Sequence, residues 1–283
     1  MPEHRPALDT EALRLAVEVG EPGSWWAQLS VVESTGSTNA DMAATARAGE
    51  APVNGASVLV AEHQLAGRGR LGRSWEAPAR SALTMSVLVR PSVAASRWPW
   101  LPLLTGLAVC DALRRVAGVQ ARLKWPNDVL VGERKLAGIL LERVETPTGA
   151  AAVIGIGLNV SAWHADLPVT ATSLALEGAG STDRQALLVG VLAALQSTYT
   201  AWTGTGADAE LRAAYVGRCA TLGRRVRIEL PDGSSVTGRA ETVDAGGRLV
   251  VRTASGRSVL GAGEVVHVRP DEPPPENRSV PTI

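Results

Sequence analysis

Residues 61–75 are AEHQLAGRGRLGRSW, and the Gly67–Arg73 segment at their centre is the most distinctive stretch of the chain. The residues before it, 57–64 (SVLVAEHQ), are apolar and β-branched, which predicts a strand that ends where the glycines begin. The three glycines let successive backbone amides form a concave nest for an anion, and the three arginines add forked donors for phosphate or carboxylate. We therefore expect an anion-binding loop after a strand; the alternative is a mobile, arginine-rich surface loop.

The same glycines match the GxGxxG pattern of dinucleotide-binding folds, which requires a helix directly after them. The following residues, SWEAP (74–78), do not begin a helix, and no Gly-Lys-Ser/Thr follows as in a P-loop. Trp75 is suited to stack on a heteroaromatic ring beside the phosphates, as nucleotide binding requires. A core or lid tryptophan is the alternative for Trp75, and Trp125 is expected in the core.

The basic residues comprise 26 arginines and two lysines, Lys124 and Lys135. Arginine replaces lysine at little cost on a solvated surface, but not where a compact ammonium group is needed. Both lysines lie in KWPNDVLVGERK (124–135), between strands predicted at 121–125 and 136–144. A hairpin would bring them together to hold a triphosphate. Chance is the alternative explanation for so small a number, but the pair still marks this segment as the first place to look for chemistry. Asn127 and Asp128 are suited to hold the backbone of a turn, and this is their whole role in one interpretation. In the alternative interpretation, Asp128 also contacts a metal or a ribose.

A further buried strand is predicted at 151–160 (AAVIGIGLNV), where Asn159 ends a run whose small glycines leave room for a ligand. Other strands are expected at 24–32 and 82–90. Helices are expected at 9–19, after Ser37-Thr38-Asn39, and at 99–117, 184–202 and 208–217.

The pattern changes near residue 218, where five short alternating strands separated by glycine turns predict a small barrel over residues 218–270. Residues 1–217 form the larger domain in this division. The proline-rich residues 271–283 have no core to join, so we expect them to be disordered.

The overall composition excludes several classes of protein. The chain has 283 residues and 28 basic against 28 acidic side chains, so a nucleic-acid or membrane-surface protein is disfavoured. It has no apolar run long enough to cross a bilayer and no signal-peptide pattern, and its two cysteines match no metal or redox spacing. These features predict a cytoplasmic protein. The four histidines are scattered, and neither a nucleophile constellation nor a metal site is evident.

Five stretches together resemble biotin protein ligases, in the order found in that family. They are Glu33-Ser-Thr-Gly-Ser-Thr-Asn39, the segment from Ala61 to Trp75, Lys124-Trp-Pro-Asn-Asp128, Arg134-Lys-Leu-Ala-Gly-Ile-Leu140 and Gly155-Ile-Gly-Leu-Asn159. The resemblance covers about residues 31–268. It implies an α+β fold, with a central mixed β-sheet catalytic domain flanked by helices and a small C-terminal SH3-like β-barrel.

The resemblance also implies a two-step, ATP-dependent reaction. Biotin's carboxylate attacks the α-phosphate of ATP, with Mg²⁺ bound to the nucleotide, to give biotinyl-5′-AMP and pyrophosphate. A lysine of the biotin carboxyl carrier domain of an acyl-CoA carboxylase, such as acetyl-CoA carboxylase, then accepts biotin. Charge neutralisation by Lys135 and the arginines suits a reaction between two anions, and a closed loop keeps water from the adenylate.

Site residues follow from the family motifs. Lys135 is expected at the biotin carboxylate and α-phosphate, and Arg70 in the loop that closes over the adenylate; these two are the candidate catalytic residues. The expected biotin-binding residues are Ser37, Thr38, Asn39, Gln64, Arg68, Gly69, Arg70 and Lys135. The expected ATP-binding residues are Trp75, Lys124, Asn127, Asp128, Asn159 and Arg73.

Some family members carry an N-terminal DNA-binding winged helix, for which the roughly thirty residues before Glu33 leave no space. We therefore expect a ligase without repressor function that binds neither DNA nor membranes and is a monomer or weak dimer. A lipoate-protein ligase-like enzyme is the nearest alternative, since it shares adenylation chemistry. A nucleic-acid-binding module is a further alternative, because residues 218–269 contain nine arginines and five acids.

Overall fold

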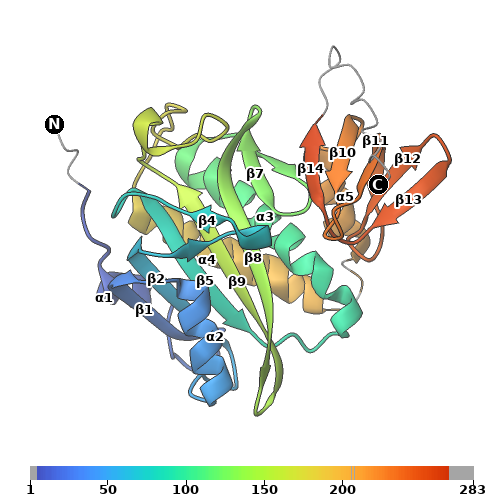
Figure 1. Cartoon of the computed structure of the whole chain (residues 1–283). Coiled ribbons are helices and arrows are strands. Elements are labelled where there is room, and N and C mark those ends of the chain that lie inside the picture. Colours follow the sequence, from blue (N-terminus) through green and yellow to red (C-terminus); the bar gives the residue numbers. More distant parts are fainter. Residues whose placement is uncertain (1–4, 205, 207, 268–283) are drawn as a thin grey trace, which may run out of the picture.

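The larger part of the protein is built on one seven-stranded sheet (Figure 1). The computed structural model describes residues 5–204, 206 and 208–267. The strand order is β1-β2-β5-β9-β8-β7-β6; β1 and β2 are parallel and the remaining neighbours antiparallel, so the sheet is mixed as predicted. The strands are β1 (Trp26–Thr35), β2 (Ala56–Gln64), β5 (Ala82–Val89), β6 (Arg122–Lys124), β7 (Asp128–Val131), β8 (Arg134–Thr146) and β9 (Gly149–Asn159).

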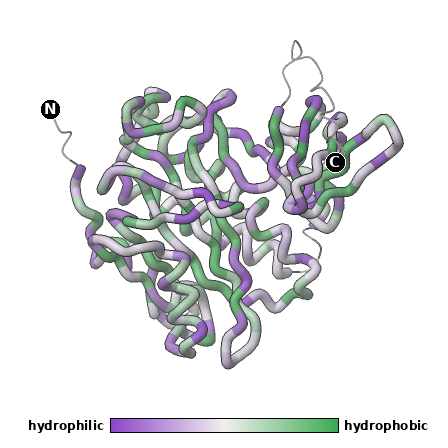
Figure 2. The backbone as a smooth tube through the Cα atoms, viewed as in Figure 1, coloured by the Kyte–Doolittle hydropathy of each residue, from purple (hydrophilic) through white to green (hydrophobic). Residues whose placement is uncertain are grey.

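Helices cover both faces of this sheet (Figure 1). Helix α2 (Thr38–Ala48) packs on one face through Met42 and its alanines, against the side chains of Leu88, Val144 and Val153. Helices α3 (Leu101–Ala112) and α4 (Arg184–Thr203) pack on the other face and build the main core. Figure 2 shows the apolar strands of the sheet between these helical layers.

The helix expected at 99–117 is divided in the structure. A 3₁₀ segment, Ala95–Trp100, precedes α3, and a π turn, Leu113–Ala117, extends it. Gly118 ends the helix with a φ of 69°, a left-handed conformation that glycine adopts without a steric penalty. The short helix α1 (Thr10–Ala16) begins where Asp9 accepts a hydrogen bond from the amide of Ala12.

Helix α4 is, among the described helices, the one with the length and apolarity of a membrane span. It packs against α3, and its side chains of Leu188, Val191 and Leu195 are fully buried. These contacts are those of a core helix. A buried ion pair joins the start of α4 to the sheet, with Arg184 Nη1 2.5 Å from Glu62 Oε2.

A second sheet, strands β10–β14, forms the C-terminal domain after helix α5 (Asp208–Arg218). All neighbouring strands are antiparallel, and β13 and β14 lie at the edges of the order β13-β12-β11-β10-β14. The strands are β10 (Arg225–Glu229), β11 (Ser235–Val243), β12 (Leu249–Thr253), β13 (Gly256–Leu260) and β14 (Glu264–His267). The five predicted strands are thus present; the boundary at 217/218 stays a prediction, and residues 271–283 lie outside the described residues.

Two tryptophans join the second sheet to the first domain. Trp125 Nε1 donates to the carbonyl oxygen of Gly247 at 3.0 Å, and Trp100 Nε1 donates to that of Ala245 at 2.7 Å. Trp125 is 1% exposed, so its expected place in the core is confirmed. The junction places the C-terminal sheet beside the Lys124–Asp128 turn, where the predicted site lies.

Candidate functional site

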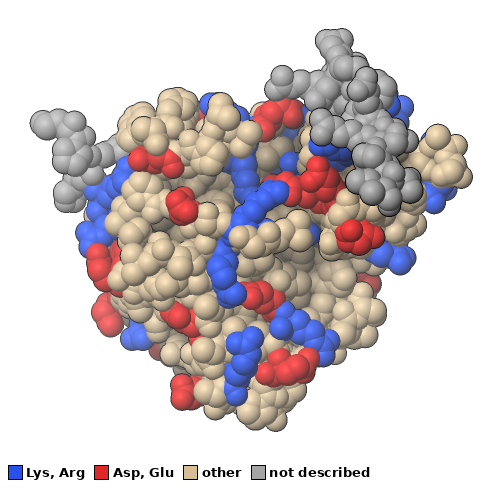
Figure 3. All heavy atoms as spheres, viewed as in Figure 1, with Lys and Arg blue, Asp and Glu red and all other residues tan. Residues whose placement is uncertain are grey.

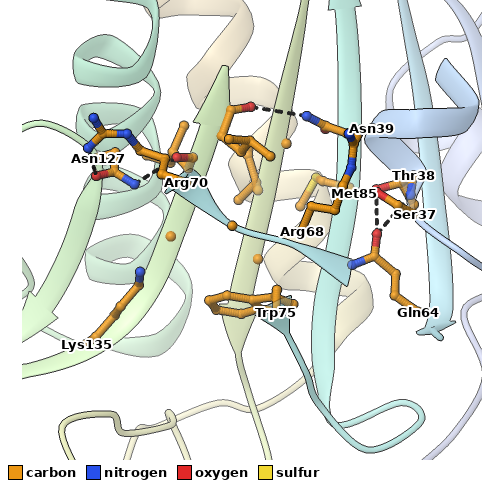
Figure 4. Close-up of a pocket in the computed structure, with 17 residues that line it drawn as sticks. Ser37, Thr38, Asn39, Gln64, Arg68, Arg70, Trp75, Met85, Asn127 and Lys135 are labelled. Atoms are coloured by element: carbon orange, nitrogen blue, oxygen red, sulfur yellow. Dashed lines mark hydrogen bonds between the residues drawn. The ribbon is translucent and has the colours of Figure 1, made fainter. Parts of the chain in front are cut away.

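The Gly67–Arg73 segment, which we call the glycine-arginine loop, lies over a small cavity at the centre of the first sheet (Figure 4). Its two ends pair as the short strands β3 (Gly67–Arg68) and β4 (Ser74–Trp75), and Leu71 and Gly72 turn the chain between them with positive φ angles. The cavity has a volume of about 50 Å³. Its lining brings together residues from four of the predicted stretches: Ser37, Thr38, Asn39, Gln64, Arg68, Gly69, Arg70, Trp75, Asn127 and Lys135.

One end of the cavity is formed where α2 begins beside the end of β2. Gln64 Oε1 accepts hydrogen bonds from the amide of Thr38 at 2.8 Å and from Thr38 Oγ1 at 3.0 Å. The Ser37 hydroxyl makes no hydrogen bond to cap the helix, and it lines the cavity. Ser37, Thr38 and Gln64 therefore offer a group of fixed donors and acceptors to a small polar ligand, as Figure 4 shows.

The glycines of β9 line the cavity and also make room for two side chains of the site. A Cβ on Gly155 would lie 2.4 Å from Asn39 Oδ1, and a Cβ on Gly157 would lie 2.4 Å from Cε2 of Trp75. Both glycines are themselves part of the cavity wall. Their small size therefore allows Asn39 and Trp75 to pack beside the cavity, and the room that they leave for a ligand stays a prediction.

Asn39 is itself held from three sides. Its Nδ2 donates to Glu142 Oε2 at 2.7 Å and to the carbonyl oxygen of Leu140 at 3.4 Å, and its Oδ1 lies 2.6 Å from Ser86 Oγ. Asn39 lines the cavity, but these contacts occupy its amide. In this structure Asn39 therefore shapes the pocket wall.

Trp75 lies flat on the sheet at the boundary between two hollows. It lines the cavity and also an adjoining hollow of about 90 Å³ formed with Lys124, Asn127 and Asp128. Lys135 Nζ lies 5.9 Å from the centre of the Trp75 ring. An aromatic face beside a group of cations suits the base and phosphates of a nucleotide.

The lysines predicted to meet across a hairpin do lie around one hollow. Lys124 pairs with Asp128 across β6 and β7, and Lys135 Nζ forms an ion pair with Asp128 Oδ1 at 2.7 Å. Burial lowers the pKa of Lys124, and the nearby charges of Lys135 and Arg73 lower it further against the opposing effect of Asp128. A bound anion would relieve this crowding of cations.

Three arginines hold the loop against both domains. Arg70 Nη1 donates to Asn127 Oδ1 at 3.0 Å and to the carbonyl oxygen of Gly263 at 3.2 Å. Arg68 pairs with Glu142 at 3.1 Å, and Arg73 pairs with Glu264. Burial lowers the pKa of Arg70, as expected for a guanidinium that is partly withdrawn from water.

The two carboxylates and the carbonyl group that bind these arginines were not predicted. Glu142, Gly263 and Glu264 lie 74, 193 and 191 residues from their arginine partners, and no motif marks them. Only the strand pattern of β8 and the alternation of β14 were available from the sequence, and neither identifies a partner.

Asn159 is the predicted residue that the structure places outside these hollows. Its Nδ2 donates to the carbonyl oxygen of Thr172 at 2.9 Å, and the residue is 3% exposed. The amide of Thr172 in turn donates to the carbonyl oxygen of Lys135 at 2.8 Å. In this structure Asn159 thus supports the backbone beside Lys135, and contact with a nucleotide remains a prediction.

The site is therefore built for electrostatic stabilisation of anions. Of the cysteines, Cys110 is a buried residue of α3, where burial raises its pKa to about 12 and makes it unsuited as a nucleophile. Within residues 5–267, where described, no three His, Cys, Asp or Glu side chains are grouped so as to hold a metal ion. A cation accompanying a nucleotide would rely chiefly on the phosphates for its ligands.

Comparison with known proteins identifies the family. Residues 31–159 match the model described as the biotin/lipoate A/B protein ligase family, and residues 221–268 match the biotin protein ligase C-terminal domain. A biotin–acetyl-CoA-carboxylase ligase from Mycobacterium tuberculosis is 44% identical over 269 residues, which cover 94% of this chain and 97% of that protein. A biotin–acetyl-CoA-carboxylase ligase from Paracoccus denitrificans is 34% identical over 82% of this chain and 97% of its own length.

A solved structure agrees with these matches. The biotin protein ligase from Aquifex aeolicus in complex with biotin and ATP superposes with a TM-score of 0.73 and 28% identity, over 86% of this chain and 100% of that one. The match of residues 221–268 is to a domain described as that of biotin protein ligases. The chain belongs to the biotin protein ligase family.

Proposed function

We propose that the protein is an ATP-dependent biotin protein ligase that forms biotinyl-5′-AMP and transfers biotin to a lysine of a biotin carboxyl carrier domain. The observation that carries this proposal is the cavity under the glycine-arginine loop, which joins the polar end at Gln64 to Lys135 and the Trp75 hollow. This order suits a ligand whose small polar ring lies at Gln64 and whose carboxylate lies at Lys135, with a nucleotide in the hollow at Trp75.

In the first step, the biotin carboxylate oxygen bonds to the α-phosphorus of ATP, and the bond from that phosphorus to the β-phosphate oxygen breaks. Pyrophosphate leaves with the electron pair. Lys135 neutralises the approaching carboxylate and phosphate, and Arg70 covers the reacting groups from the loop. Ser37, Thr38 and Gln64 orient the ring of biotin, so that its carboxylate lies toward Lys135.

In the second step, a carrier lysine attacks the carbonyl carbon of the mixed anhydride, and AMP leaves. The closed loop protects the anhydride from water until the carrier arrives. The buried contacts of Arg70 with Asn127 and Gly263 hold the loop in that position.

Three finer features extend the proposal. The nucleotide substrate is MgATP. The cluster of Lys124, Lys135 and Arg73 binds the phosphate charge that Mg²⁺ does not neutralise. The acceptor is the carrier domain of an acyl-CoA carboxylase, supported by the names of the relatives from M. tuberculosis and P. denitrificans. The protein acts in the cytoplasm, where its two buried, unpaired cysteines are stable.

The test is calorimetry with biotin, with and without MgATP, followed by mass spectrometry for biotinyl-5′-AMP and then for a biotinylated carrier domain. Lipoate replaces biotin in a parallel series. We expect adenylate and carrier modification with biotin, and neither with lipoate. Equal turnover of lipoate, or no adenylate from biotin, contradicts the proposal.

A further inference from the structure

The site continues beyond the hollow that Trp75 forms with Lys124, Asn127 and Asp128, into a larger cleft between the two domains. This cleft has a volume of about 920 Å³ and shares Arg73, Lys124, Asp128 and Lys135 with the hollow beneath Trp75. Its far wall belongs to the C-terminal domain and includes Arg224 and His267. Lys135 lines the biotin cavity, the hollow and the cleft, so the three form one continuous path with Lys135 along it.

The direction of the reaction assigns a use to this cleft. In an in-line displacement, the attacking and leaving oxygens lie on opposite sides of the α-phosphorus. If the carboxylate approaches from the biotin cavity and the phosphorus lies at Lys135, the leaving group points away from that cavity. The interdomain cleft is the space on that side, and Figure 3 shows basic and acidic side chains meeting at the border between the domains.

The charges of the cleft suit a polyanion. Lys124 makes no ion pair with a carboxylate among the described residues, although it lies near Asp128. On the opposite wall, Arg224 donates to both carboxylate oxygens of Glu133, at 2.7 and 2.8 Å, and lies 3.3 Å from His267 Nδ1. The Arg224 side chain is 36% exposed, and it faces the same cleft as Lys124.

The Glu133 pair keeps a guanidinium ready in a fixed orientation. Glu133 lies in the turn of the β7–β8 hairpin, and the strands of this hairpin carry Asp128 and Lys135. Arg224 immediately precedes β10. Arg224 thus spans the two domains beside the phosphate-binding lysines. A diphosphate presents the same forked acceptor geometry as the Glu133 carboxylate, with more charge.

We propose that the C-terminal domain supplies part of the pyrophosphate site, and that Arg224 binds the β- and γ-phosphates of ATP and the departing pyrophosphate in exchange for Glu133. This inference rests on the proposed function and deepens it, because it assigns the leaving-group end of the nucleotide. It makes Arg224 a phosphate-binding residue, with Glu133 as its resting partner.

The test measures inhibition of adenylate formation by inorganic pyrophosphate and by AMP, together with the KM for MgATP. For Arg224→Gln we expect the pyrophosphate inhibition constant and the KM to rise by about tenfold, the loss of one charge-assisted contact, with inhibition by AMP and the Kd for biotin unchanged. AMP lacks the phosphates that reach the cleft. Arg257→Gln, which removes an exposed arginine paired with Glu241 on β13, is the matched control and should behave as wild type.

Glu133→Gln separates phosphate binding from a purely structural tie between domains. If Arg224 and Glu133 only hold the domains together, both variants weaken pyrophosphate and biotin binding alike. Under the proposal, Glu133→Gln releases Arg224 and leaves pyrophosphate inhibition unchanged or stronger. Should Arg224→Gln fail to fold, Arg224→Lys keeps the charge without the fork and should still weaken pyrophosphate inhibition.

Equal pyrophosphate inhibition of wild type and the folded Arg224 variants overturns this inference while leaving the proposed function intact. A wild-type protein that forms no biotinyl-5′-AMP instead contradicts the proposed function, so the two failures are distinguishable.

Discussion

Lys135 Nζ lies 2.7 Å from Asp128 Oδ1 across the β7–β8 hairpin, and the same ammonium lines both the biotin cavity and the nucleotide hollow. The carboxylate thus holds the lysine at the point where two anionic substrates must meet. Asp128 balances the charge of Lys135 before the substrates bind.

Replacement of Lys135 by arginine should slow adenylate formation by at least about tenfold, equivalent to roughly 1.4 kcal/mol of transition-state stabilisation. Arginine keeps the charge, but its planar fork does not fit the position of a compact ammonium beside Asp128 and Trp75. Single-turnover adenylation measures the effect, with the thermal midpoint of unfolding as a control for folding. Wild-type rates in a folded Lys135→Arg variant would remove Lys135 from the mechanism.

Arg70→Gly should still form the adenylate but release it. The variant loses the hydrogen bonds to Asn127 and Gly263 that hold the loop closed, whereas Lys135 remains at the reacting phosphate. Free adenylate then acylates lysines of unrelated proteins. The measurement mixes the variant with biotin, MgATP and a bystander protein and probes the bystander for biotin. Unchanged bystander labelling with intact adenylation would show that Arg70 does not retain the intermediate; lost adenylation would place it in the chemical step.

The amides of Gly67–Arg73 should exchange hydrogen faster in the free protein than in the presence of biotin and MgATP. Without ligand, the closed loop depends on ion pairs at its exposed edge, such as Arg73 with Glu264, and these contribute little free energy. The ligands add buried contacts that only the closed state provides. Hydrogen exchange with mass spectrometry tests this, with the amides of α4 as an internal reference. Equal protection in both states contradicts the prediction.

Gly157→Ala should weaken nucleotide binding more than biotin binding. The new Cβ would lie 2.4 Å from Trp75 Cε2, so the indole ring must move off the sheet or the strand must shift. We expect overpacking to cost about 1–3 kcal/mol of unfolding free energy if the ring stays. Gly217→Ala, on α5, has open space around it and is the control. The KM for MgATP and urea unfolding measure the two effects; identical behaviour of both variants would show that Trp75 has no fixed position there.

Glu62→Gln should destabilise the protein by about 3–5 kcal/mol, because it leaves the buried guanidinium of Arg184 without its counter-charge. The Glu62 carboxylate also accepts the amide of Leu8, so the change loosens the N-terminal segment as well. Chemical denaturation gives the free energy of unfolding. A decrease of less than about 1 kcal/mol in the free energy of unfolding, which is the range for exposed ion pairs, would show that water solvates the Arg184 guanidinium in place of Glu62.

Local patterns predicted the secondary structure and most of the site. The apolar, β-branched run of β2, the turn after Lys124 and the glycines at 67, 69 and 72 are short-range signals, and the structure confirms the strand and the two turns. The family motifs also brought Gln64 and Lys135 to one cavity, as expected. These features depend on neighbours in the sequence.

Features that depend on distant packing could not be predicted. Gly263, which accepts from Arg70, and Glu264, which pairs with Arg73, come from another domain. Which side chains pack against Gly155 and Gly157 likewise depends on what covers β9. Asn159 shows the same limit: its place after a glycine-rich strand suggested a ligand contact, yet its amide faces Thr172. Sequence order alone does not determine such side-chain contacts.

The location of both lysines of the chain within the active site has a consequence for self-modification. The proposed intermediate is an amine-reactive anhydride, and the most abundant target for it on a protein surface is lysine. This chain has 26 arginines and only Lys124 and Lys135, which lie half-buried around the nucleotide hollow. The guanidinium groups elsewhere remain protonated and do not act as nucleophiles. The enzyme therefore exposes almost no side-chain amine to its own product, and biotin found on a lysine of the ligase would lie on Lys124 or Lys135.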